Sequence, residues 1–371
     1  MKRLLSTLFA LCCLLSMAAA QHPATPVFVA GRDGYQSYRI PAIVSLANGD
    51  LLAFAEGRVD GAADFGNVDI VMKRSTDHGK TWSALKVIVD NGALQAGNSA
   101  PVADLTDPAY PNGRIFLFYN TGDQPEGKIR SGHGSRQVWY KTSSDGGATW
   151  SGGVNITAQV KQKGWRSYAN TPGHAMQFSH GKYKGRIYVA ANHSAGDPLP
   201  HFEDYHAHGF YTDDHGKTFH LSEPISFPGS NEATAAELCG NALMMNMRNQ
   251  KGNPKCRIVA ISHDGGVHWD TTYYDHHLPD PVCQGSLLNI GEKHHKSILA
   301  FCNNDDTTGR QNLTLRMSLD GGKTWPKKYL VDKRGESTAY SDIVKTAKHK
   351  VGVLYERKGY SQIVFKVLKW K

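Results

Sequence analysis

Cysteine is scarce in the sequence, which has six in 371 residues. Cys12 and Cys13 lie in the apolar N-terminal segment, and the other four show no Cys-x-x-Cys spacing: Cys239, Cys256, Cys283 and Cys302. The missing spacing argues against a zinc site. Four cysteines allow three disulfide pairings, and nothing in the sequence selects one of them. Buried, unpaired thiols in strands are an equally acceptable interpretation.

Long hydrophobic runs are also lacking, because no stretch after the N-terminus reaches the ~18 apolar residues of a transmembrane helix. At the N-terminus, Lys2 and Arg3 precede an apolar segment over residues 4–15 and small residues at 18–20. This layout is typical of a secretory signal peptide with cleavage after Ala20. We therefore expect a leader over residues 1–20 and one exported domain, secreted or periplasmic, over residues 21–371. A lipoprotein anchored at Cys12 or Cys13 is the alternative, but the preceding residues make no convincing lipidation site.

Charge of one sign is not gathered into blocks along the sequence, although the formal net charge is +9. A basic excess suits acidic substrates, nucleic acids and membrane surfaces equally well. The lysines are scattered and no nucleic-acid-binding motif is present, so we expect no nucleic-acid partner. The 18 histidines lack HExxH or facial-triad spacing. We therefore expect neither a metal nor another cofactor.

Helical periodicity is scarce, whereas one eight-residue motif recurs. It reads Ser-x-Asp-x-Gly-x-Thr-Trp in its fullest form, and its copies occupy residues 75–82, 143–150, 262–269 and 318–325, with a looser copy at 212–219. The aspartate can accept hydrogen bonds from backbone amides of a turn, and the glycine tolerates a positive φ. The terminal aromatic side chain can pack on the sheet. Each copy, here called an Asp-box, predicts a self-stabilised hairpin turn rather than a catalytic site.

The spacing of the Asp-boxes indicates the fold. Five hairpins recur at intervals of roughly 50 to 70 residues with apolar strands between them. No linker, low-complexity run or charge block divides the chain after residue 20. We therefore expect an all-β protein with a single β-propeller domain.

Two short motifs near the N-terminus carry a resemblance to a known family. Tyr38-Arg39-Ile40-Pro41 is followed by Glu56-Gly57-Arg58, and both accompany the Asp-boxes. In this combination the chain resembles the exo-α-sialidases (neuraminidases) of the bacterial and animal type, from about Tyr38 to about Phe365. The resemblance implies a six-bladed β-propeller with its active site at the centre of one face. It also implies sialylated glycans as substrates and no cofactor. The sequence does not indicate an oligomeric state, and we expect a monomer.

The resemblance assigns a three-arginine cluster that would bind the carboxylate of sialic acid. Arg39 matches the first member, Arg257 the second and Arg310 the third. Arg316 competes for the third place, but it lies within the strand leading into the last Asp-box. Arg58 resembles an arginine that reaches the substrate from the second strand.

The resemblance also assigns the catalytic groups. Tyr340 and Glu237 match the nucleophile and its base, with Glu232 as a competitor for the base. Asp64 matches the acid/base catalyst by its distance from Arg58, although Asp60 and Asp69 lie close to it in the sequence. Asp104 stands where the family often has a residue that touches the sugar.

The chemistry of the expected substrate is consistent with these residue types. Guanidinium groups bind a carboxylate through paired, charge-assisted hydrogen bonds. A carboxylate nucleophile would be repelled by the substrate's own charge, whereas a neutral tyrosine would not, provided that a base removes its proton. The alternatives are transfer or an anhydro product on the same fold, a catalytically silent sialic-acid-binding propeller, and a glucan hydrolase with paired carboxylates.

Overall fold

The structure, a computed structural model, describes residues 23–333 and 335–370. The expected leader over residues 1–20 lies outside the described residues. Within them the chain is almost entirely β, with three short helical segments: α1 (Glu126–Arg130), α2 (Thr157–Val160) and η1 (Pro200–Phe202). None of these segments is long and apolar enough to cross a membrane.

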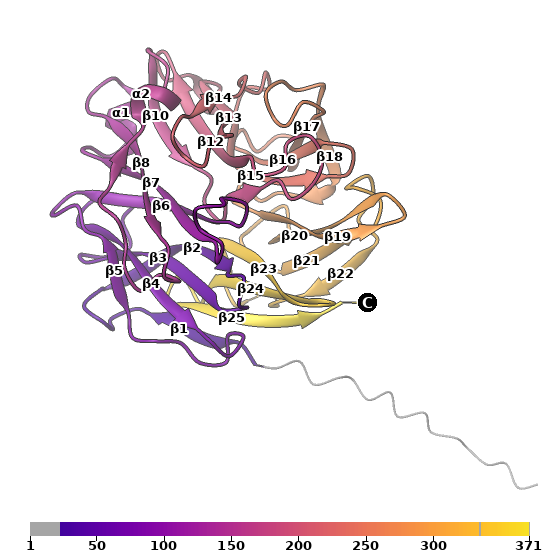
Figure 1. Ribbon diagram of the computed structural model, residues 1–371. Helices are drawn as coiled ribbons and strands as arrows, with labels where there is room; N and C mark the ends of the chain where they lie inside the picture. Colours follow the sequence, from indigo (N-terminus) through magenta and orange to yellow (C-terminus); the bar gives the residue numbers. More distant parts are fainter. Residues whose placement is uncertain (1–22, 334, 371) are drawn as a thin grey trace, which may run out of the picture.

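The strands form sheets that follow one another around a common centre in chain order (Figure 1). The first sheet has eight strands: β2 (Ser37–Ser45), β3 (Leu51–Arg58), β4 (Val68–Ser75), β5 (Lys86–Val89), β6 (Gln95–Asp104), β7 (Arg114–Gly122), β8 (Arg136–Ser143) and β9 (Val154–Asn155). The second has five: β10 (Trp165–Asn170), β11 (Met176–Gln177), β12 (Ile187–Ala195), β13 (Tyr205–Thr212) and β14 (His220–Leu221).

Three four-stranded sheets complete the ring. One contains β15 (Ser230–Leu238), β16 (Ala242–Asn249), β17 (Cys256–Ser262) and β18 (Thr271–Pro279). The next contains β19 (Ser286–Lys293), β20 (Lys296–Asn304), β21 (Leu313–Ser318) and β22 (Lys327–Leu330). The last contains β23 (Ser341–Ala347), β24 (Lys350–Arg357), β25 (Gln362–Lys369) and the N-terminal β1 (Thr25–Val29), which pairs with β25 and so joins the two ends of the chain.

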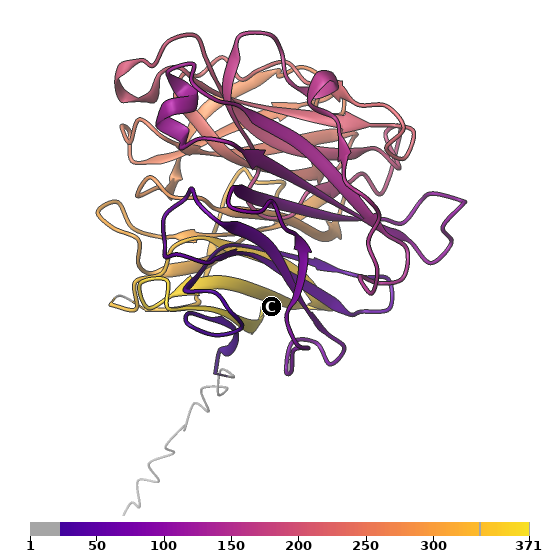
Figure 2. The same cartoon turned by 90° about the vertical axis from the view of Figure 1, so that its left-hand side faces the viewer.

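The all-β, propeller-like arrangement is confirmed, but the strands do not form six separate sheets. Hydrogen bonding gives five sheets in the described residues, because β4 and β6 belong to one sheet. The connection between these two strands is a single parallel pair, Val68 with Gln95. Seen from the side, the strands run across the molecule and loops extend from both of their ends (Figure 2).

The Asp-boxes form the predicted turns. They connect β4 to β5, β8 to β9, β13 to β14, β17 to β18 and β21 to β22. In the first box the amide of Gly79 donates to Ser75 Oγ at 2.8 Å and the amide of Thr81 donates to Asp77 Oδ1 at 2.9 Å. Gly79 has φ +86°, and a Cβ on it would lie 2.1 Å from the ring of Phe365. The residue at this position must therefore be glycine for both conformational and steric reasons.

Apolar side chains fill the space between neighbouring sheets. Phe118 on β7 packs edge-on against Phe210 on β13, with ring centroids 5.6 Å apart. The four cysteines of the described residues are free and three of them are buried, so the open question of their pairing is answered in favour of thiols.

The innermost strands of the ring all run in the same direction, from one end of the molecule to the other. Each starts at one end of the molecule, where a cavity of about 570 Å³ opens, and finishes at the other end, where a separate hollow of about 1230 Å³ opens. Arg39 on β2 and Glu232 on β15 line the first, whereas Val44 and Glu237 on the same strands line the second. The direction of the inner strands thus decides which residues can meet.

Candidate active site

A tyrosine, a glutamate and an arginine from three different strands or strand ends meet in the smaller cavity. Tyr340, directly before β23, donates a short hydrogen bond from its hydroxyl to Glu232 on β15. Arg248 on β16 donates to Glu232 Oε2 at 2.8 Å and to the Tyr340 hydroxyl at 3.1 Å. Burial and the Glu232 carboxylate raise the pKa of Tyr340 well above its ordinary value, and the charges of Arg248 and Arg39 act in the opposite direction.

Arg39 is held in place by a buried carboxylate, that of Glu356 on β24. Arg39 Nε donates to Glu356 Oε1 at 2.9 Å. The same carboxylate accepts from the backbone amides of Ile40 at 2.9 Å and Tyr340 at 3.0 Å. Although burial acts to lower it, the Glu356 charge raises the pKa of Arg39 above its ordinary value. Glu356 therefore fixes both the first arginine and the backbone of the tyrosine, a role that no sequence motif indicated.

Arg310 completes a group of three arginines around Tyr340. It donates to the hydroxyl of Tyr360 and to the carbonyl of Val282, each at 3.3 Å. Its guanidinium carbon lies 5.7 Å from the centroid of the Tyr340 ring, and that of Arg39 lies 5.2 Å from the same centroid. Together with Arg248, these side chains form a strongly cationic cavity wall that suits an anion.

Asp64 lies at the rim of this cavity. Its carboxylate accepts from Arg58 Nη1 at 2.8 Å and lies 3.7 Å from Arg39 Nη1, and its side chain is 78% exposed. Arg58 is itself buried and bonded to Glu56 through Nε at 3.2 Å and Nη2 at 2.6 Å. Asp69 does not line this cavity and instead accepts a hydrogen bond from the Tyr35 hydroxyl at 2.6 Å. Asp64 is thus an exposed carboxylate beside a rigid arginine.

The structure brings together five of the expected site residues: Arg39, Arg58, Asp64, Arg310 and Tyr340. The other three, Asp104, Glu237 and Arg257, lie elsewhere.

Arg257 is entirely buried and does not reach the cavity. On β17 it donates to Asn246 at 2.7 Å, to Asp280 at 3.1 Å and to the carbonyl of Cys283. Its charge is balanced by Asp280 inside the protein, which leaves Arg248 on the neighbouring strand as the second arginine of the cavity.

Glu237 lies at the wrong end of its strand for a contact with Tyr340. It accepts from the amides of Ser179 at 2.9 Å and His180 at 3.1 Å and lines the larger hollow. Five residues of extended chain separate it from Glu232, which corresponds to roughly 17 Å. The competitor Glu232 therefore occupies the place expected for Glu237.

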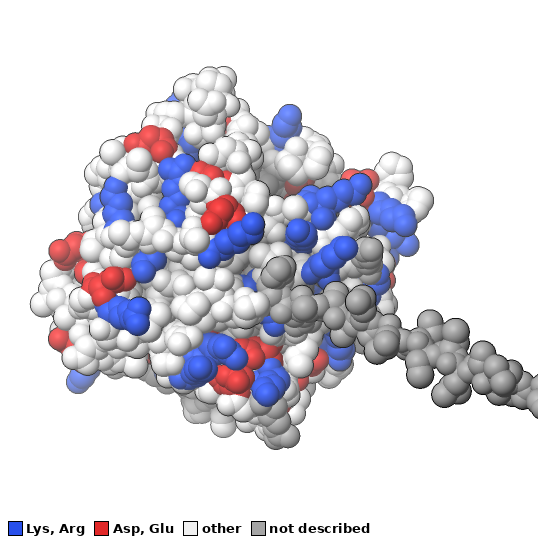
Figure 3. Space-filling view, turned by 90° about the horizontal axis from the view of Figure 1, so that it is seen from below, with Lys and Arg blue, Asp and Glu red and all other residues white. Residues whose placement is uncertain are grey.

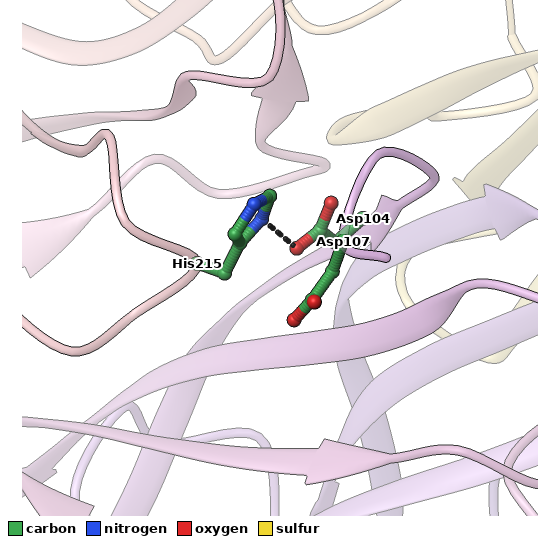
Figure 4. Close-up of side chains that lie close together, drawn as sticks. All are labelled: Asp104, Asp107 and His215. Carbon is green, nitrogen blue, oxygen red and sulfur yellow. Dashed lines mark hydrogen bonds and ion pairs between the residues drawn. The ribbon is translucent and has the colours of Figure 1, made fainter. Parts of the chain in front are cut away.

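Asp104 is buried at the end of β6 and contacts another loop rather than the cavity (Figure 4). It accepts from Gln177 Nε2 at 2.7 Å, and its Oδ2 lies 2.9 Å from His215 Nδ1. With Asp107 these residues form a group whose ligand atoms lie within 4.8 Å of one another, as metal ligands do. However, the guanidinium of Arg114 lies 3.0 Å from Asp107 and 4.0 Å from Asp104, so a cation already balances both carboxylates. We interpret the group as a structural contact that connects the first sheet to the second.

Arg316, the competitor for the third arginine, is buried on β21 and pairs with Asp305. Arg310 rather than Arg316 lines the cavity.

Fold and cavity together define a class: propeller-like proteins with a cationic pocket around a tyrosine–glutamate pair. Comparison with known proteins narrows this class. A family model described as a BNR repeat-like domain matches residues 49–353. The chain is 30% identical to the exo-alpha-sialidase of Aspergillus fumigatus, over 87% of this chain and 79% of that protein. The chain belongs to the sialidase family.

Two further similarities agree with this assignment. The sialidase of Micromonospora viridifaciens is 33% identical over 88% of this chain, but the chain spans only 51% of its length. In structure, the chain is similar to the Hadza microbial sialidase Hz136, with a TM-score of 0.81 and 28% identity, over 93% of this chain and 68% of the other. The chain thus spans about half the length of the Micromonospora protein.

Proposed function

We propose that the chain is a retaining exo-α-sialidase that releases terminal, α-ketosidically linked sialic acids from glycoproteins, glycolipids and oligosaccharides. The single observation that carries this proposal is the hydrogen-bonded pair of Tyr340 and Glu232 in a cavity bordered by three arginines. Membership of the sialidase family supports it.

Arg39, Arg248 and Arg310 are proposed to bind the carboxylate of the sugar. Three guanidinium groups around one spot repel one another, and only part of this charge is offset by Glu232 and Glu356. An anionic substrate relieves the remaining repulsion and gains paired hydrogen bonds. These three arginines would hold the anomeric carbon beside the Tyr340 hydroxyl, because the carboxylate of sialic acid is attached to that carbon.

Tyr340 is proposed as the nucleophile and Glu232 as its base. Sialidases are exceptions to the two-carboxylate rule of glycosidases. As the tyrosine oxygen bonds to the anomeric carbon, its proton passes to Glu232, and the bond to the glycosidic oxygen breaks. Asp64 protonates that leaving oxygen. The neutral phenol meets no repulsion from the substrate carboxylate, and its raised pKa makes the adjacent base necessary.

In the second half of the reaction Asp64 takes a proton from water, whose oxygen attacks the anomeric carbon. The tyrosine oxygen leaves and recovers its proton from Glu232. Two displacements at the same carbon give net retention. The exposure of Asp64 at the rim, where water can reach it, supports this assignment.

We further propose how the chain is organised. The eight-stranded sheet counts as two blades, since one parallel residue pair is all that joins β4 to β6, and the propeller then has six. Residues 1–20 are proposed as a cleaved leader and residues 21–371 as one catalytic domain. The protein would be exported, secreted or periplasmic, and act as a monomer on sialylated glycans.

The test is product analysis by NMR with α2,3- and α2,6-sialyllactose, using Tyr340→Phe as the inactive control. We expect free sialic acid that appears first as the α-anomer. If the product is an anhydro sugar or a transferred sialoside, the same site catalyses a related reaction instead of hydrolysis. Binding without turnover would support the silent, sialic-acid-binding alternative and overturn the proposal.

A further inference from the structure

The net charge of the protein is concentrated at one end of the chain. Residues 321–371 contain 13 lysines and arginines against four aspartates and glutamates, a net charge of +9 that equals the charge of the whole sequence. Residues 1–320 are therefore neutral overall. The excess of basic over acidic side chains thus lies in the last strands of the ring, although 29 of the 42 lysines and arginines precede them. Lys and Arg side chains are spread over the side of the molecule seen in Figure 3, with fewer Asp and Glu among them.

Two neighbouring hairpins carry six exposed lysines on the side of the molecule opposite the active site. One is the turn from β19 to β20, and the other is the turn from β23 to β24 together with the end of β25. We name this surface the lysine face; its members are Lys293, Lys296, Lys345, Lys348, Lys350 and Lys369. His295 of the first turn and Lys345 of the second line the same large hollow, so the two turns are close in space.

The lysine face is not neutralised by the protein itself. Its six ammonium groups form no ion pair with a carboxylate in the described part of the chain, whereas Lys73 pairs with Asp33 at 2.9 Å and Lys251 pairs with Glu203 at 2.7 Å. Glu292 lies beside Lys293 in the sequence, but its carboxylate lies 3.5 Å from His295 Nδ1. Positive charge therefore accumulates at this surface.

Two pairs of these lysines oppose each other directly across strands. Lys293 is the register partner of Lys296, and Lys350 is the register partner of Lys369. Like charges at opposed positions destabilise a sheet. Folding alone gives no reason for this arrangement, whereas a bound polyanion would convert the repulsion into attraction.

We propose that the lysine face binds a linear acidic polysaccharide, with carboxylate or sulfate groups on successive sugars. Exposed lysines spread over two turns beside a large hollow suit a repeated anion better than a single small one. The exposed large apolar side chains of the described chain include none from residues 292–298 or 345–350, which disfavours insertion into a bilayer. These turns also lack an exposed Trp, Tyr or Phe on which nucleic-acid bases could stack.

This site leaves the proposed active site free. Tyr340 directly precedes β23, and the lysines begin near the other end of that seven-residue strand. At about 3.3 Å per residue, the two sites lie on the order of 20 Å apart along the strand. A protein held by the lysine face would thus present its cationic cavity to the opposite side. The inference does not depend on sialidase activity.

The test compares two triple variants of equal charge change. Lys345→Gln/Lys348→Gln/Lys350→Gln removes half of the lysine face, and Lys80→Gln/Lys163→Gln/Lys217→Gln removes three exposed lysines elsewhere. Binding is measured to immobilised heparin and polygalacturonate, with dextran as the neutral control, at several salt concentrations. We expect salt-sensitive binding to both acidic polymers, lowered about tenfold in the first variant and less than twofold in the second. Thermal melting shows whether both variants remain folded.

Three results would overturn the proposal. One is an equal loss in both variants, which would mean that net charge alone is responsible. Another is tighter binding to duplex DNA, or to vesicles containing phosphatidylserine, than to the polysaccharides. The third is no binding to either acidic polymer at low salt by a wild-type protein that melts cooperatively.

Discussion

At the scale of single residues, two glutamates on one strand provide a matched test of the proposed mechanism. Glu232→Gln should lower kcat by about 10²–10⁴-fold, because the amide cannot accept the proton of Tyr340. Glu237→Gln should leave kcat within about twofold, because Glu237 bonds Ser179 and His180 at the other end of β15. Initial rates with sialyllactose measure both. Equal losses in the two variants would exclude Glu232 as the specific base.

Two arginines give a second contrast at this scale, between binding and stability. Arg310→Ala should lower kcat/KM by the equivalent of roughly 3–5 kcal/mol, if its bond to the substrate behaves as a desolvated ion pair. Arg257→Ala should instead lower the free energy of unfolding by about 3–5 kcal/mol, because Asp280 would remain buried without its partner.

Kinetics and denaturant unfolding of both variants separate these effects. A loss of less than tenfold in kcat/KM for Arg310→Ala would show that Arg310 does not bind the substrate carboxylate. A fully stable Arg257→Ala protein would contradict the buried ion pair.

The sequence predicted the site residues that belong to local motifs and missed those that depend on strand direction. Arg39 and Arg58 stand in short motifs, so their positions follow from a few neighbouring residues. Glu232 and Glu237 share one strand, and only the direction of β15 decides which of them faces Tyr340. One signal was available: pairing around the turn at Gly240, as in Ala236 with Met244, places Glu232 near Arg248.

At the scale of elements, the Asp-boxes make part of the stability depend on pH. The pKa of Asp145 is lowered to about 2, chiefly by hydrogen bonds from the side chain and amide of Thr149. The ordinary value is about 3.9. A depressed folded-state pKa stabilises the fold fully above the ordinary value, and this contribution is lost as the pH falls through the lowered one.

We therefore expect the Tm of Asp145→Asn to lie below that of the wild type at pH 5, and the difference to shrink as the pH falls from 4 towards 2. Melting curves across this range measure it. Asp197→Asn, which removes an exposed ion pair with Arg166 at 2.9 Å, serves as the control and should change Tm little at any pH. A difference for Asp145→Asn that stays constant down to pH 2 would contradict the pKa shift.

The turns could be predicted because their contacts are local in the sequence. The grouping of the strands into sheets could not, because it depends on residues far apart in the sequence. All the side chains that hold an Asp-box lie within eight residues of one another, so the motif contains its own explanation. The pairing of Thr25 with Phe365 joins the two ends of the chain, and the pair Val68–Gln95 merges two strand groups into one sheet. No local pattern indicates either contact.

At the scale of the whole molecule, one buried carboxylate joins the inner strands. Asp342 on β23 accepts from the amide of Ile43 on β2 at 2.8 Å, from the amide of His174 at 2.9 Å and from Ser286 Oγ on β19 at 2.6 Å. These donors belong to different sheets or to the segment between β10 and β11. Asp342 thus connects the parts of the ring at its centre.

Replacing Asp342 should therefore weaken the entire ring rather than one sheet. We expect Asp342→Ala to lower the free energy of unfolding by about 3–5 kcal/mol, because several buried donors lose their acceptor. Guanidinium chloride unfolding, followed by both tryptophan fluorescence and circular dichroism, measures this change. Asp50→Ala, which removes a pair with Arg74 within one sheet, should cost about 1 kcal/mol. Equal losses in the two variants would refute a central role for Asp342.

The same carboxylate makes the stability of the ring sensitive to pH on the alkaline side. His174 Nδ1 lies 2.7 Å from Asp342 Oδ1, and although burial acts to lower it, the Asp342 charge raises the pKa of His174. A raised folded-state pKa stabilises the fold fully below the ordinary value of about 6.5, and this contribution is lost as the pH rises through the raised value. Wild-type stability should therefore fall over this range, and His174→Gln should remove most of the fall. Parallel slopes of unfolding free energy against pH in the two proteins would show that His174 is neutral throughout.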